Sequence, residues 1–142
     1  MPTQINTKIA RLSCLSLISQ ISYMKKTIVL GATPDSSRYA YLASNKLVRF
    51  GHEIINVGIK SGEVAGVPIE KPEYIHAGVD TITLYVGPKN QQSLYDYILN
   101  TSPKRIIFNP GTENAELENL AEQKGIETVL GCTLVMLSTG EY

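Results

Sequence analysis

The chain has 142 residues, 43% of them hydrophobic and 18% charged, which is enough for one globular domain with a substantial core. The 13 Lys and Arg residues balance the 13 Asp and Glu residues, and no basic stripe marks a nucleic-acid binder. No apolar run approaches the ~20 residues needed to span a bilayer. The sequence therefore predicts a cytoplasmic protein with neither a nucleic-acid nor a membrane partner.

Residues 1–23 differ in composition from the rest of the chain. They are rich in Ser, Gln and Thr and contain no acidic residue, and the apolar patch at residues 12–18 is short and broken by serines. Met24 leads straight into the first predicted strand. We expect residues 1–23 to be a non-essential extension, with a targeting segment as the alternative, and residues 24–142 to form the domain.

Apolar runs and 3.6-residue periodicity alternate along the rest of the chain. Five strands are expected at residues 26–30, 53–57, 81–86, 105–108 and 127–130. Helices are expected at residues 36–50, 88–99 and 113–124, with Gly51 and Gly125 as C-terminal caps. Residues 61–72 read as a loop holding a short extended piece at 67–69, and residues 132–138 as a short helix or coil.

This alternation predicts an α/β fold, a doubly wound, Rossmann-like, five-stranded parallel sheet in a single three-layer domain. Ligands of such sheets bind at the carboxyl ends of the strands. Five loops meet at that edge, and each contains a glycine, which lets the backbone approach a ligand closely. These loops are residues 31–38, 58–62, 87–90, 109–112 and 131–133.

The loop after the first strand is typical of a phosphate site. An apolar run ends at Gly31, and a turn of small and polar residues leads into a helix N-terminus, where free amides and the helix dipole favour an anion. A dinucleotide fingerprint would need two further glycines, but Thr33 and Ser36 stand at those positions. Serine is a good N-cap, and Arg38 is disfavoured by the dipole unless a phosphate lies beside it.

The end of the second strand distinguishes between nucleotides. NAD-binding folds carry an Asp or Glu there for the ribose hydroxyl, whereas this strand is followed by Gly58, Ile59 and Lys60. Lys60 is either a solvated loop lysine or a ligand of a ribose phosphate. If Lys60 binds a ribose phosphate, the ligand is NADP or coenzyme A (CoA) and not NAD.

No catalytic or metal-binding constellation is evident. His52 and His76 are expected to be structural, and Cys14 and Cys132 lack metal-ligand spacing and are expected to be reduced thiols. Cys132 follows the fifth strand and is expected to be buried or in the pocket wall. No catalytic residue and no metal ligand is therefore predicted.

From Lys26 to about Leu137 the chain resembles the small stand-alone CoA-binding proteins, whose fold is that of the CoA-binding domain of the succinyl-CoA synthetase α subunit. The similarity is carried by the first loop through Arg38, by Ile55-Asn56-Val57-Gly58, by Gly66-Val67-Pro68-Ile69, by Asn109-Pro110-Gly111 and by Cys132. The proline usual after Asn56 in that family is replaced by Val57.

The resemblance implies CoA as the cofactor, with its ADP part against the first loop and the end of the second strand. It implies that the pantetheine arm crosses the loops after the third and fourth strands. The candidate binding residues are Gly31, Ala32, Thr33, Ser36, Ser37, Arg38, Asn56, Val57, Lys60, Val86, Gly87, Pro88, Asn109 and Gly111.

The expected function is binding of CoA or an acyl-CoA without catalysis of its own, and a homodimer or a complex with a partner chain is left open. Three alternatives remain open. The first is an NADP-binding protein or reductase fragment. The second is a subunit that supplies the CoA site of an acyl-CoA ligase, and the third is a scaffold that has lost its ligand.

Overall fold

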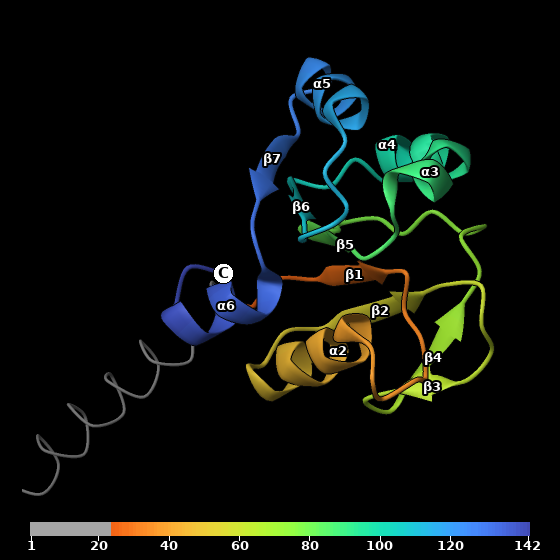
Figure 1. Ribbon diagram of the computed structural model, residues 1–142, viewed down its shortest axis with the longest axis vertical. Coiled ribbons are helices and arrows are strands. Elements are labelled where there is room, and N and C mark those ends of the chain that lie inside the picture. Colours follow the sequence, from red (N-terminus) through yellow and green to blue (C-terminus); the bar gives the residue numbers. More distant parts are fainter. Residues whose placement is uncertain (1–23) are drawn as a thin grey trace, which may run out of the picture.

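Strands and helices follow one another along residues 24–142, the part of the chain that the computed structural model describes (Figure 1). The extension predicted at residues 1–23 lies outside the described residues. In chain order the elements are β1 (Thr27–Leu30), α2 (Tyr39–Arg49), β2 (Ile54–Val57), β3 (Glu63–Val64), β4 (Val67–Glu70), β5 (Thr81–Leu84), α3 (Pro88–Gln91), the 3-10 helix η1 (Gln92–Leu94), α4 (Tyr95–Thr101), β6 (Arg105–Phe108), α5 (Ala115–Gln123), β7 (Glu127–Leu130) and α6 (Thr133–Thr139).

The sheet has seven strands in the order β3-β4-β2-β1-β5-β6-β7, so the predicted number of five is wrong. All neighbouring pairs are parallel except β3 with β4. The two additional strands come from the segment predicted as a loop. They form a hairpin whose turn residues, Ala65 and Gly66, both have positive φ, the geometry that closes a two-residue hairpin.

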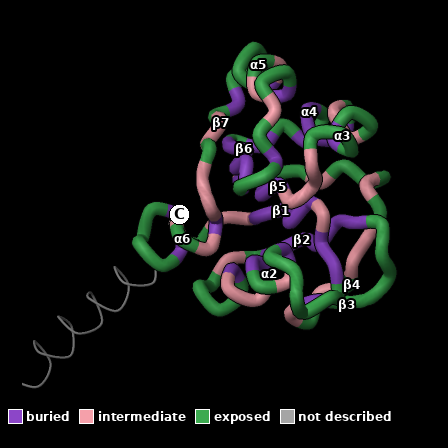
Figure 2. The backbone as a smooth tube through the Cα atoms, in the orientation of Figure 1, coloured by how far each residue is buried: buried purple, intermediate pink, exposed green. Residues whose placement is uncertain are grey.

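The sheet lies between two helical layers, which confirms the Rossmann-like α/β class. Side chains of β1 alternate between the two faces. Ile28 and Leu30 belong to the core cluster with α4 and α5, whereas Val29 belongs to the cluster with α2 and α6. Figure 2 shows these central strands buried between the helices. No helix within residues 24–142 is long and apolar enough to cross a bilayer.

All three predicted helices differ in their bounds, and the third, α5, starts two residues later and ends one residue earlier than predicted. The first begins at Tyr39 instead of Ser36, because Asp35 Oδ1 accepts from the amide and the hydroxyl of Ser37 at 3.0 and 2.7 Å and holds the preceding residues in a turn. The second is divided into α3, η1 and α4, and it ends at Thr101.

Candidate functional site

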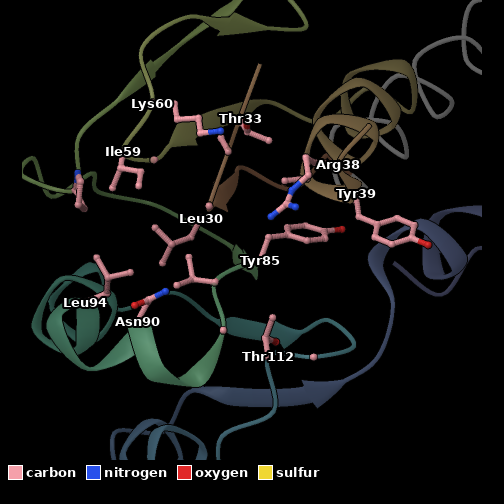
Figure 3. A pocket seen from close by; sticks show the side chains of 18 of the residues that line it. Leu30, Thr33, Arg38, Tyr39, Ile59, Lys60, Tyr85, Asn90, Leu94 and Thr112 are labelled. Carbon is pink, nitrogen blue, oxygen red and sulfur yellow. The ribbon is translucent and has the colours of Figure 1, made fainter. Parts of the chain in front are cut away.

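A cleft of about 980 Å³ lies at the carboxyl ends of the central strands (Figure 3). This volume is at the upper end of the ~300–1,000 Å³ typical of small-molecule sites. The cleft is bounded by the loops after β1, β2, β5 and β6 and by the first turns of α2 and α3. Its lining comprises Leu30, Gly31, Ala32, Thr33, Ser37, Arg38, Tyr39, Ala40, Gly58, Ile59, Lys60, Pro72, Tyr85, Val86, Gly87, Lys89, Asn90, Gln92, Ser93, Leu94, Pro110, Gly111 and Thr112.

The loops after β1 and β2 are in direct backbone contact. The amides of Gly31 and Ala32 both donate to Val57 O, at 2.8 and 3.0 Å. A Cβ on Gly58 would lie 2.4 Å from Ala32 O, closer than real Cβ atoms approach. Gly31 has φ +101°, in the region that favours glycine. Both glycines are therefore needed to form this floor of the cleft.

The N-terminus of α2 opens into the cleft. Arg38 is the N-cap in extended conformation, and no side chain caps the helix. The first-turn amides of a helix have no intrahelical acceptor, and Tyr39 and Ala40 of this turn line the cleft. This end of α2 can therefore take an anionic group.

The charged lining of the cleft is entirely cationic. It consists of Arg38, Lys60 and Lys89, with no Asp or Glu among the lining residues. Figure 3 shows Arg38 and Lys60 extending into the cleft from different elements. The one salt bridge within residues 24–142, His76 Nε2 to Glu70 Oε2 at 2.8 Å, involves none of these cations. Since the chain has no net charge, this arrangement concentrates positive charge at the cleft.

Asp35 is an acidic neighbour of these cations. Hydrogen bonds from the hydroxyl and amide of Ser37 are the largest cause that lowers the pKa of its carboxyl, with smaller effects of Lys60 and Arg38. The carboxylate is occupied by the Ser37 turn and does not line the cleft.

Tyr85 forms part of the wall on the side of α2. Burial raises the pKa of its phenol, so the group stays protonated across the physiological range. Its hydroxyl is buried and has no hydrogen-bond partner among the described residues. Cys132 is a half-buried free thiol before α6 and is not a lining residue, and Cys14 lies outside the described residues.

Most sequence-predicted binding residues line this one cleft: Gly31, Ala32, Thr33, Ser37, Arg38, Lys60, Val86, Gly87 and Gly111. The structure places the remaining five elsewhere. Ser36 and Pro88 are exposed beside the cleft, while Val57 is fully buried in β2.

Asn56 and Asn109 are buried braces between elements. Asn56 is fully buried and Asn109 is 2% exposed. Asn109 Nδ2 donates to Thr83 Oγ1 and to Leu84 O at 2.7 and 2.9 Å, and its Oδ1 accepts from the amide of Thr133 at 2.9 Å. This asparagine therefore ties β6 to β5 and to the start of α6.

Sequence reasoning missed several lining residues, of which Lys89, Tyr85 and Gly58 are the most informative. Lys89 directly follows Gly87-Pro88, in a loop that the sequence already placed at the carboxyl edge. The sequence therefore predicts the position of Lys89 at this edge, although it does not predict that the side chain faces the cleft. Histidine, cysteine and acidic side chains of the described residues nowhere gather in groups of three that could hold a metal.

Comparisons with known proteins agree with this architecture. A family model described as "CoA binding domain" matches residues 25–138. The crystal structure of an uncharacterized protein is 59% identical, covers 84% of this chain and 98% of its own, and has a TM-score of 0.82. No curated protein matches the chain at comparable significance.

Two more distant structures support the fold alone. A protein from Thermus thermophilus is 21% identical over 90% of this chain and 98% of its own, with a TM-score of 0.71. A hypothetical protein from Pyrococcus horikoshii is 22% identical over 87% of this chain and 89% of its own, with a TM-score of 0.74. The family match spans both core layers and all the loops that form the cleft. The chain therefore belongs to the CoA binding domain family, as its sequence motifs indicated.

Proposed function

We propose that the cleft binds CoA or an acyl-CoA and that the domain performs no catalysis of its own. The observation that carries this proposal is the charge of the cleft: three cations and an uncapped helix N-terminus, with no acidic lining residue. CoA carries a diphosphate and a ribose 3′-phosphate, and these anionic groups match the cations and the free helix amides of the cleft.

The residues divide into two groups along the ligand. The diphosphate would lie against the first turn of α2 and Arg38, since the helix dipole and the guanidinium both favour an anion there. Lys60 would hold the ribose phosphate. Val86, Gly87 and Gly111 would contact the pantetheine arm on the loops after β5 and β6.

Binding without turnover is supported by the chemistry of the lining. The side chains that line the cleft include no histidine, cysteine or carboxylate, so the Ser and Thr hydroxyls of the lining have no histidine or carboxylate base within it. The Tyr85 phenol is held protonated, as its raised pKa indicates.

NADP is the competing ligand, because it also has a diphosphate and a ribose phosphate. The absence of the second and third fingerprint glycines argues against it, since Thr33 and Ser36 stand at those positions. A ligase-subunit role is a second alternative, and copurification of an ATP-grasp partner would favour it.

Calorimetric titration of the full chain with CoA, acetyl-CoA, dephospho-CoA, NADP and NAD at one salt concentration tests the proposal. Saturable binding of CoA, weaker binding of dephospho-CoA and no binding of NAD are expected. NADP binding without CoA binding would replace the proposal by the reductase alternative. If no ligand bound, the scaffold or partner-chain alternatives would take its place.

A further inference from the structure

The side chain of Gln91 joins two loops that form one wall of the cleft. Gln91 is the last residue of α3 and is fully buried. Its Nε2 donates to Val86 O and to Thr112 O, each at 2.8 Å. Val86 follows β5 and Thr112 follows β6, so a single amide group spans the gap between two adjacent strands at their carboxyl ends.

The partners of this amide are themselves held in place. Gln91 Oε1 accepts from Asn114 Nδ2 at 2.8 Å, and Asn114 caps α5 through Oδ1, which accepts from the amide of Glu116 at 3.1 Å. Thr112 donates its amide and its hydroxyl to Asn109 O, at 2.9 and 2.7 Å. The two loops therefore cannot change their separation without breaking buried hydrogen bonds.

The cleft side of both loops is open. A Cβ built on Gly87 or on Gly111 would have no heavy atom within 4 Å, and both glycines line the cleft. Gln91 itself is not a lining residue. It lies behind the wall and holds the carbonyls of Val86 and Thr112 from the protein side.

We propose that Gln91 is a positioning residue that sets the width of the channel for the pantetheine arm. The inference rests on the proposed function, because that function places the pantetheine arm on these two loops. The nucleotide part of CoA would lie on the other side of the cleft, at α2 and Lys60. It would not contact the two loops that Gln91 holds. The two halves of CoA should therefore respond differently to its loss.

The experiment compares CoA with adenosine 3′,5′-bisphosphate, which carries the ribose 3′-phosphate but no pantetheine, in the wild type and the variants Gln91→Met and Gln91→Asn. Methionine keeps the length of the side chain and removes all three hydrogen bonds. Asparagine keeps an uncharged amide but is one methylene group too short to span both carbonyls, and it is the variant to use if Gln91→Met does not fold. Gln123→Met, at an exposed position at the end of α5, is the matched control.

In the Gln91 variants we expect Kd for CoA to rise about tenfold and Kd for adenosine 3′,5′-bisphosphate to change less than about twofold. Equal weakening of both ligands would overturn the inference, because it would indicate a general structural role. Unchanged affinity for CoA would overturn it as well.

Failure of the proposed function would look different, since the wild type would then bind neither compound. In that case, amide hydrogen exchange of the ligand-free protein tests whether Gln91 holds the two loops in place. Faster exchange confined to the Gly87 and Gly111 loops in Gln91→Met would support the brace, and unchanged exchange there would overturn it.

Discussion

The hydroxyl of Ser44 donates to Oδ1 of Asn56 at 2.7 Å, in the interface between α2 and β2. Both side chains are fully buried. Asn56 Nδ2 donates in turn to Val64 O and Val67 O, each at 3.0 Å. One asparagine therefore joins the first helix, the second strand and the β3–β4 hairpin, which explains why a buried polar residue is accommodated at this position.

Replacing Asn56 by alanine should destabilise the fold. The change leaves the Val64 and Val67 carbonyls and the Ser44 hydroxyl without their partner, at a cost of about 2–4 kcal/mol in the free energy of unfolding. Urea unfolding followed by circular dichroism measures the effect. Asn119→Ala, at an exposed position of α5, should change stability by less than about 0.5 kcal/mol. Equal stability of the two variants would contradict the role of Asn56.

The fold class and the edge of the sheet that carries the cleft could be predicted because both depend on periodicity. Strands such as 27–30 and 105–108 are short apolar runs between helical patterns. In a parallel sheet the loops that follow such strands must meet at one edge. This reasoning needs no knowledge of side-chain orientation, which is why the predicted loops and the observed cleft agree.

The β3–β4 hairpin and the hydrogen-bond partners of the Asn56 and Asn109 side chains could not be predicted, because they do not depend on sequence periodicity. β3 has only two residues, and its turn depends on a positive φ at Ala65, which no sequence pattern signals. The sequence placed Asn56 and Asn109 near the ends of their strands, as observed. Whether an amide there points to a ligand or to neighbouring backbone depends on three-dimensional packing.

Gly58→Ala tests the contact between the first two loops. An added Cβ would lie 2.4 Å from the backbone oxygen of Ala32, so the floor of the cleft must shift. We expect a loss of about 2–3 kcal/mol in stability by urea unfolding, together with weaker CoA binding. Gly87→Ala is the matched control for stability, since its φ of −65° suits alanine and nothing lies within 4 Å of the new Cβ. Comparable losses in both variants would refute the steric explanation.

The raised pKa of Tyr97 leads us to expect a loss of folding stability at alkaline pH. Burial, followed by the charge of Glu70, raises the pKa of its phenol from 10 to about 12. The folded state therefore retains a proton that the unfolded state releases. The stabilisation is fully present below pH 10 and is lost as the pH rises toward about 12.

Tyr97→Phe should reduce the loss of stability between pH 9 and about pH 11, as measured by urea unfolding at each pH. At pH 7 the variant should be at least as stable as the wild type, because the Tyr97 hydroxyl is buried without a partner among the described residues. Tyr74→Phe is the control, since Tyr74 is 66% exposed. A pH profile of Tyr97→Phe that matches the wild type would assign the alkaline loss to Tyr85 and Tyr142, whose pKa values burial also raises.

Lys60 and Arg38 give the sharpest test of how the ligand lies in the cleft. If Lys60 holds the ribose phosphate, Lys60→Met should weaken CoA binding about tenfold and leave dephospho-CoA binding unchanged. Arg38→Met should weaken both ligands by a similar factor, because the diphosphate is common to them. CoA binding by either variant should also depend less steeply on salt, since one cation has been removed from a charged interface.

Calorimetry at two salt concentrations measures all of these quantities. Lys104→Met, at an exposed position before β6 and outside the cleft, controls for the general loss of a positive charge. Equal weakening of CoA and dephospho-CoA by Lys60→Met would move the contact of Lys60 from the ribose phosphate to the diphosphate. In that case Lys89, the remaining cation of the cleft, would be the candidate for the ribose phosphate. Lys89→Met would then have to show the discrimination that Lys60→Met lacked.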